Sequence, residues 1–207
     1  MMPMLIKERE YRAMSTLFTP VTETTKRLDS NYYVEGYATT FTRYLLWEHE
    51  GVRYYEEIAP NALDSADLSD VIMQYDHQGR VLARNRNGTL GVEVDESGIF
   101  MFADLSKSDA AKGIYNDITE RLVDRMSWAF TIGKQKFERL DQTTYLRVIE
   151  QIKKMYDVSA VSTPANDATI ISARSFAERS FLAEQQERLG LQARKLKLKA
   201  KIGGLEL

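Results

Sequence analysis

Two histidines and no cysteine set narrow limits on the chemistry of this 207-residue chain. Without a thiol there can be no disulfide, no cysteine nucleophile and no zinc held by cysteines. His49 and His77 alone also nearly exclude a multi-histidine metal site. The remaining candidates for catalysis are hydroxyls, carboxylates, amides, basic side chains and one of these two imidazoles.

Ser127 lies within a bulky apolar run, Met126–Phe130, where a serine can be either a core hydroxyl or a nucleophile. A serine nucleophile needs an imidazole to accept its proton and a third group to orient that imidazole. His49 belongs to a polar turn between strands, which is a poor place for a rigid base. His77 closes an expected strand just before a turn at Gln78–Arg80. His77 is therefore the candidate base, with a surface histidine as the alternative interpretation.

The body of the chain, from about Asn31 to Ser172, is typical of strands separated by turns. Gly36 interrupts the first strand as a β-bulge would. Asn87–Gly88 and Glu96–Gly98 mark turns, and the second of these joins the two strands of a predicted hairpin. Runs rich in β-branched and aromatic residues favour strands: YYVEGYATTF, VRYYEEIAP, VIMQYDH, TLGVEV, IFMFADL, RMSWAFTIGKQKFERL and TTYLRVIEQIKKMYDVSAV.

One segment, Ser106–Val123, changes to a helical period, with Ser108 and Asp109 suited to cap it. Its apolar residues recur at every fourth position: Ala110, Ile114, Ile118 and Leu122. The segment NALDSADLSD, residues 61–70, also carries helix-starting residues. Several antiparallel strands with one or two helices predict an α+β fold, mainly an antiparallel β-barrel, closed or half closed, with a few surrounding helices.

The C-terminal stretch from Arg174 to Leu207 differs in charge from the rest. It holds eight Lys or Arg and four Asp or Glu, so it is basic within a chain of net charge −2. Apolar residues near heptad spacing predict an amphipathic helix or coiled-coil strand there: Phe181, Leu182, Leu189, Leu196 and Ile202. Such a helix could pack on its own domain, tether or assemble with another protein, or bind nucleic acid through ARKLKLKAK. We divide the chain into an N-terminal extension (1–30), a main domain (31–173) and a basic helical tail (174–207).

No apolar run reaches the roughly 18–20 residues of a membrane span, and the N-terminus lacks the long apolar region of a secretory signal. A net charge of −2 gives no general attraction for nucleic acid. We therefore expect a cytosolic protein without membrane or nucleic-acid partners.

Four stretches, in order, resemble the prohead serine proteases of tailed bacteriophages, whose barrel is related to herpesvirus assemblin. They are GYATTF with the following Ile58–Leu63 turn, YDHQGRVLARNRNGTL, MSWAF and YDVSAVSTPAN. The last three are similar to the family's histidine segment, its Met-Ser-Phe-Gly-Phe nucleophile strand and its Tyr-Glu-Val-Ser-x-Val-x-x-Pro-Ala-Asn pattern. The chain departs from the family where Trp128–Ala129 replaces Phe-Gly and Asn61 replaces a usual glycine, and Trp128 could narrow the substrate cleft.

The resemblance implies that Ser127 is the nucleophile and His77 the general base. Assemblin has a second histidine after its serine, but no histidine follows His77 here, so an acidic residue must orient the imidazole. We expect Glu150 in that role, with Asp157 as the alternative, although either could be a surface strand charge. Asp76 is next to His77 and so points to the opposite strand face.

The resemblance also implies a serine endopeptidase that works through an acyl-enzyme without metal or organic cofactor. Its substrates would be the scaffolding segment of the major capsid protein and the protease itself. It would act in the host cytoplasm, inside the assembling procapsid, and the tail would serve packaging or self-cleavage. A homodimer, as in assemblin, stays open. The oxyanion hole is not located, although the loop Val161–Asn166 is a candidate.

Two other functions compete with this interpretation. A catalytically silent scaffold or capsid-binding protein could keep the same fold, but the retained Ser127 and His77 count against it. A small-molecule hydrolase on an unrelated barrel is the weaker alternative, since no G-x-S-x-G nucleophile elbow is present.

Overall fold

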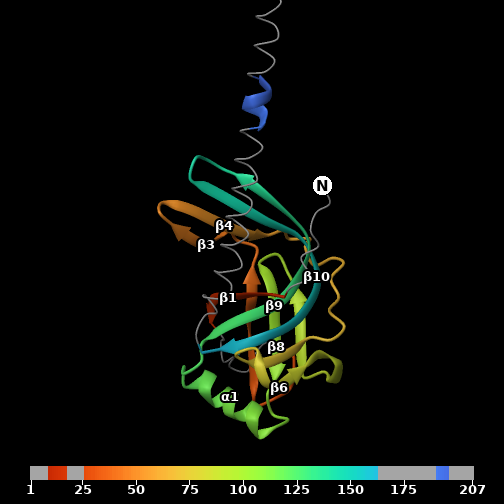
Figure 1. Ribbon diagram of the computed structural model, residues 1–207. Coiled ribbons are helices and arrows are strands. Elements are labelled where there is room, and N and C mark those ends of the chain that lie inside the picture. The colour runs from red at the N-terminus through yellow and green to blue at the C-terminus, as the bar shows by residue number, and fades with distance from the viewer. Residues whose placement is uncertain (1–8, 18–25, 163–189, 196–207) are drawn as a thin grey trace, which may run out of the picture. The chain divides into compact units, whose positions relative to one another are not determined.

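The computed structural model describes residues 9–17, 26–162 and 190–195 (Figure 1). The chain divides into two compact units, Met1–Thr169 and Ile170–Leu207. Of the second unit only residues 190–195 are described, and they are helical, as the sequence predicts. The apolar residues from which the tail helix is predicted lie outside the described residues. No described helix is long and apolar enough to cross a membrane.

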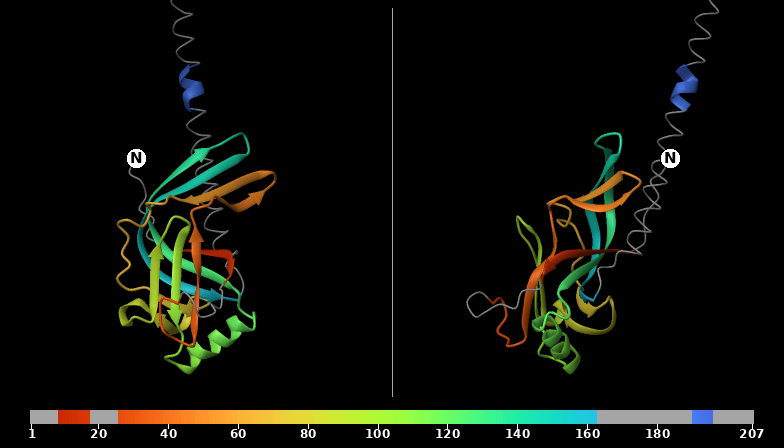
Figure 2. Two further views of the ribbon diagram at one scale, coloured as in Figure 1. Left: turned by 180° about the vertical axis from the view of Figure 1, so that it is seen from behind. Right: turned by 90° about the vertical axis from the view of Figure 1, so that its left-hand side faces the viewer.

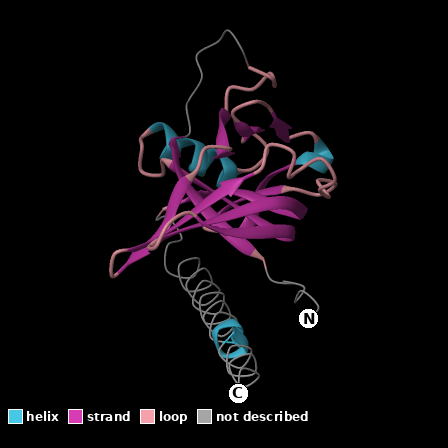
Figure 3. Cartoon of the chain, turned by 90° about the horizontal axis from the view of Figure 1, so that it is seen from above, coloured by secondary structure: helices cyan, strands magenta, loops and turns pink. Residues whose placement is uncertain are grey.

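Strands make up most of the first unit, and helices are few (Figure 3). The elements, in chain order, are β1 (Glu10–Leu17), β2 (Tyr33–Thr40), β3 (Tyr44–His49), β4 (Val52–Ile58), β5 (Ile72–Tyr75), β6 (Gln78–Arg84), the 3₁₀ turn η1 (Asn85–Asn87), β7 (Leu90–Val94), β8 (Gly98–Asp104), α1 (Asp109–Thr119), β9 (Arg125–Arg139) and β10 (Thr144–Val161). The α+β class predicted from the sequence is confirmed.

The long antiparallel pair β9–β10 is the centre of a seven-stranded sheet with the order β1-β9-β10-β4-β3. The first part of β10 pairs with β4 in parallel, and its last part pairs with β5, which in turn pairs with β6. β9 is buried on both faces from Met126 to Ile132, which explains its continuous apolar run. The described strands show no closed barrel, so the barrel prediction is not confirmed.

The second sheet has three strands in the order β2-β8-β7. β7 and β8 form the predicted hairpin, and Gly98 is required there because an added Cβ would lie 2.1 Å from the Thr39 carbonyl oxygen. The irregularity in β2 falls between Tyr37 and Thr39 rather than at Gly36. One buried apolar cluster draws residues from both sheets and from α1, which lies at the opposite end of this unit from β3 and β4 (Figures 1 and 2).

The predicted helix is present as α1, and Ser108 caps it by accepting a hydrogen bond from the Ala111 amide. It ends earlier than the apolar spacing suggests, because Arg121 takes a left-handed backbone conformation (φ 59°) and Leu122 is exposed. Residues 61–70 do not form a helix: they make turns and a single bridge from Asp67 to Lys154. The helix-starting residues of this segment serve those turns instead.

Residues of the predicted N-terminal extension form a strand of the main sheet. β1 pairs antiparallel with β9, from Glu10 opposite Phe130 to Leu17 opposite Arg125. The side chains of Glu10 and Arg12 enter a buried ion network with Glu56 and Arg147.

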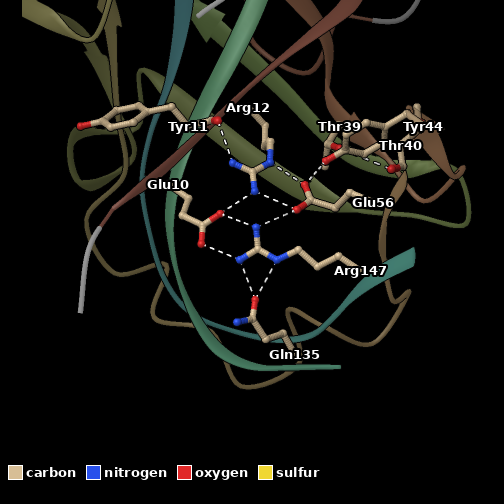
Figure 4. A network of polar contacts seen from close by, with 9 residues as sticks. All are labelled: Glu10, Tyr11, Arg12, Thr39, Thr40, Tyr44, Glu56, Gln135 and Arg147. Carbon is tan, nitrogen blue, oxygen red and sulfur yellow. Dashed lines mark hydrogen bonds and ion pairs between the residues drawn. The ribbon is translucent and has the colours of Figure 1, made fainter. Parts of the chain in front are cut away.

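This ion network, with its two acidic and two basic side chains, is neutral. The guanidinium groups of Arg12 and Arg147 lie one above the other, with Glu10 on one side and Glu56 on the other (Figure 4). Arg12 donates to Glu56 at 2.5 and 2.8 Å, and Arg147 donates to Glu10 at 2.7 and 2.9 Å. Tyr44 also donates to Glu56, which is completely buried. The network thus links β1, β3, β4 and β10.

The charges of the network control the pKa of its carboxyls. Burial by itself raises the pKa of Glu56, but Arg12 and Arg147 outweigh burial and hold it below the ordinary 4.5. The pKa of Glu10 is lowered for the same reasons. The network therefore contributes its full stability above a pH of about 4.5 and loses it as the pH falls through the lowered pKa values.

We expect Glu56→Gln to lower the free energy of unfolding by about 3–5 kcal/mol at neutral pH, because two buried guanidinium groups lose a counter-charge. The variant should also show a weaker pH dependence of unfolding below pH 4.5. Chemical denaturation over a pH series measures both effects. Glu57→Gln is the matched control, since Glu57 pairs with Arg43 at the surface and should matter by less than about 1 kcal/mol. Equal stability of the two variants would contradict this account.

Candidate active site

His77 lies in the two-residue turn that joins β5 to β6. Tyr75 pairs with Gln78, so Asp76 and His77 are the two central residues, with φ of 48° and 57°. Positive φ at both centres is the geometry of a type I′ hairpin turn, which suits the twist of the flanking strands. The turn therefore comes earlier than the sequence suggests, because Gln78 already belongs to β6.

Asp76 fastens this turn to the end of β10. Its backbone N–H donates to the Ala160 carbonyl at 2.9 Å. Its carboxylate accepts from the backbone N–H and the hydroxyl of Ser162, at 2.9 and 2.8 Å. Asp76 and His77 both lie in the turn rather than on a strand, so the expected alternation of strand faces does not apply to them. The Asp76 carboxylate binds Ser162 and stabilises the left-handed turn that carries the imidazole.

Two adjacent rows of residues across β1, β9 and β10 share one face of the sheet. Ser127 lies opposite Ser159 on β10. Ala129, two residues after Ser127 on β9, lies opposite Tyr11 on β1 and Asp157 on β10. Because side chains alternate between faces along a strand, these two rows point to the same side.

The imidazole of His77 connects the two rows through both ring nitrogens. Nε2 lies 2.7 Å from the Ser127 hydroxyl oxygen, and Nδ1 lies 2.6 Å from Asp157 Oδ1. The side chain of His77 is 11% exposed and that of Asp157 is 4% exposed, so solvent weakens their interaction little. With Nδ1–H donating to the carboxylate, the lone pair of Nε2 faces the serine hydroxyl. This arrangement can take a proton from Ser127 and stabilise the imidazolium that results.

A comparison with known families matches residues 20–181 to the caudovirus prohead serine proteases. The chain belongs to that family. No curated protein and no solved structure matches significantly. Family membership makes the chain a serine peptidase of the phage prohead, which confirms the resemblance. Ser127, His77 and Asp157 lie within the matched residues, whereas β1 precedes them.

Ser159 is a further part of the site that the sequence reasoning missed. Its hydroxyl donates to Asp157 Oδ1 at 2.7 Å, the same oxygen that accepts from His77. Ser159 is fully buried. The signal was present in the YDVSAV motif, because a residue two positions after Asp157 on a strand must share its face.

Glu150, the residue first expected to orient His77, lies elsewhere. Its carboxylate pairs with Lys134 Nζ at 2.8 Å, and this hydrogen bond lowers the pKa of Glu150. Seven positions separate Glu150 from Asp157 on β10, which is on the order of 20 Å along a strand. In this structure the two ring nitrogens of His77 contact Ser127 and Asp157, so the residue brought to the imidazole is the alternative, Asp157, and not Glu150.

The expectation about Trp128 also changes, whereas His49 lies outside the site as expected. Trp128 is fully buried and stacks on Phe130 with ring centroids 4.0 Å apart, so it lies in the core and cannot narrow a cleft. His49 ends β3 with a half-exposed side chain and stacks on Trp47, away from Ser127.

The loop considered for the oxyanion hole lies outside the described residues except for Val161 and Ser162. The described residues contain no group of three or more possible metal ligands.

We expect Asp157→Asn to slow the reaction of Ser127 by a factor on the order of 10³–10⁴, because the amide can hold the imidazole in the wrong tautomer. The rate of labelling by a fluorophosphonate, which reacts with activated serine hydroxyls, measures this without a known peptide substrate. Glu150→Gln is the control and should label at the wild-type rate. A slow Glu150→Gln with an unimpaired Asp157→Asn would reverse the assignment.

Ser159→Ala should slow the same labelling by a factor on the order of 10, since it removes one hydrogen bond to a charged carboxylate. Ser69→Ala is the matched control, because Ser69 donates to the exposed Asp67 at 2.6 Å. Thermal unfolding of both variants separates lost reactivity from lost stability. Labelling of Ser159→Ala at the wild-type rate would show that Asp157 needs no support from this hydroxyl.

Proposed function

We propose that the chain is a serine endopeptidase that matures the phage procapsid by cleaving the scaffolding segment of the major capsid protein and itself. Ser127 is the nucleophile, His77 the general base and Asp157 the carboxylate that orients it. The observation that carries this proposal is the contact of one imidazole with both groups, at 2.7 Å and 2.6 Å. The procapsid in the host cytoplasm is the proposed place of action.

In the first half of the reaction, the Ser127 oxygen attacks the carbonyl carbon of the scissile peptide. His77 Nε2 takes the hydroxyl proton, and Asp157 stabilises the imidazolium through Nδ1–H. The C–N bond then breaks, His77 gives its proton to the leaving nitrogen, and an ester joins the substrate acyl group to Ser127. No metal or organic cofactor takes part in these proposed steps.

In the second half, His77 accepts a proton from water as the water attacks the ester. The bond to Ser127 breaks, and the serine oxygen recovers its proton from His77. The tetrahedral intermediates require donors for their oxyanion. The loop Val161–Asn166 stays our proposal for that role.

The burial of Ser127 favours a protease that opens its site for a selected peptide. Ser127 has no exposed surface in this structure, so a peptide reaches it only after neighbouring groups move. A site of this kind suits cleavage of an extended scaffolding segment presented at high local concentration. A catalytically silent scaffold or capsid-binding protein remains the competing function, but it has no need for an imidazole held between a buried carboxylate and a buried hydroxyl.

Co-expression with a major capsid protein that carries its scaffolding segment tests this function. We expect the wild type to shorten the capsid protein, and Ser127→Ala and His77→Ala to leave it at full length, because each lacks a reacting group. Gel electrophoresis and mass spectrometry of the capsid protein measure the cleavage. Ser97→Ala, in the β7–β8 turn, is the control and should process normally. Undiminished processing by Ser127→Ala would show that the nucleophile lies elsewhere.

A further inference from the structure

The ring of Tyr11, on β1, contacts the imidazole of His77. The two ring centroids lie 4.7 Å apart with an interplanar angle of 65°, an edge-to-face arrangement. Tyr11 shares a cross-strand row with Ala129 and Asp157, so it approaches the imidazole from the same sheet face as the carboxylate. Ala129, between them in the row, contributes only a methyl group and leaves room for the imidazole.

The ring of His77 is attached to the backbone through Cβ–Cγ, and its two hydrogen bonds act at ring nitrogens. These restraints leave a small tilt of the ring about the line that joins Nδ1 to Nε2. The lone pair of Nε2 lies in the ring plane and is not collinear with that line, so a tilt turns it away from the Ser127 hydroxyl. An edge-to-face contact with a neighbouring ring opposes such a tilt.

Contacts on both faces of β1 hold Tyr11 in position. Its neighbours Glu10 and Arg12 point to the opposite face, where they form the ion network with Arg147 and Glu56. On the side of Tyr11, the guanidinium of Arg9 lies 3.9 Å from the ring centroid of Tyr156 on β10. These contacts determine the position of β1 and hence that of Tyr11.

We propose that Tyr11 is a positioning residue for His77, and that β1 is a working part of the active site although it precedes the residues matched to the family. This inference rests on the proposed function, because it concerns the base of the same reaction. Tyr11 acts through the imidazole and takes no part in bond making or breaking. It sets the tilt at which His77 accepts the serine proton.

The test measures fluorophosphonate labelling of the full chain over a range of probe concentrations, which separates the maximal rate of labelling from the affinity for the probe. We expect Tyr11→Ala and Tyr11→Leu to lower the maximal rate roughly 3- to 10-fold with unchanged affinity. Tyr11→Phe should restore most of the rate, because the ring makes the contact. Leucine keeps much of the volume, so a loss shared by both variants cannot come from an unfilled space alone.

Tyr37→Ala is the matched control, because Tyr37 makes a similar edge-to-face contact with Phe100 (5.1 Å, 71°) in the other sheet. It should label at the wild-type rate even if its unfolding temperature falls. Labelling of Tyr11→Ala at or above the wild-type rate would overturn the positioning role, and a faster rate would make Tyr11 a cover over Ser127 instead. If the wild type were not labelled at Ser127, the proposed function would fail as well, so the two failures are distinguishable.

Discussion

The register between β9 and its two neighbours is the constraint on which the site depends. Ser127 faces Ser159, and Ala129 faces Asp157, because β9 and β10 pair in one alignment over this stretch. A slip of one residue would send Ser127 to the opposite face and bring Trp128 toward the imidazole. The core prevents this slip, since Trp128 and Phe130 are fully buried on the other face of the same strand. Packing on one side of β9 thus holds the chemistry on the other side in place.

His77 comes from a separate hairpin, the β5–β6 turn, where its backbone takes an unfavourable positive φ. A non-glycine residue with positive φ is unfavourable, and such residues persist only where the surroundings hold them. Here the Asp76 carboxylate binds Ser162 and its amide binds Ala160, both at the end of β10. The strand that supplies Asp157 therefore also positions the turn that supplies His77. The distance between the Asp157 carboxylate and the His77 imidazole depends on one strand rather than on the packing of two distant elements.

The residue types in the sequence are enough to select the imidazole, whereas the three-dimensional register decides which carboxylate lies beside it. His77 follows from the small number of imidazoles, and α1 from the Ser108 cap and the apolar spacing. A choice between Glu150 and Asp157 requires knowing which residue of β9 each one lies opposite. Several register shifts between β9 and β10 mean that this pairing cannot be counted from the sequence. β1 was missed because its partner lies more than 100 residues away in the chain. Its buried side chains, Glu10 and Arg12, are also of types that normally mark a surface.

The burial of these charges has a consequence for β1 as an edge strand. An apolar strand could slide along β9 with little loss of contact, whereas each ion pair of the network forms in one alignment only. Displacement by one residue would turn Glu10 and Arg12 away from Arg147 and Glu56, and would leave Tyr11 facing the buried charges. The penalty for unpaired buried charge makes such a state far less stable than the observed one. The alternation of Arg9, Glu10, Tyr11 and Arg12 therefore specifies two things together: the ion network on one face of β1 and the ring contact to His77 on the other.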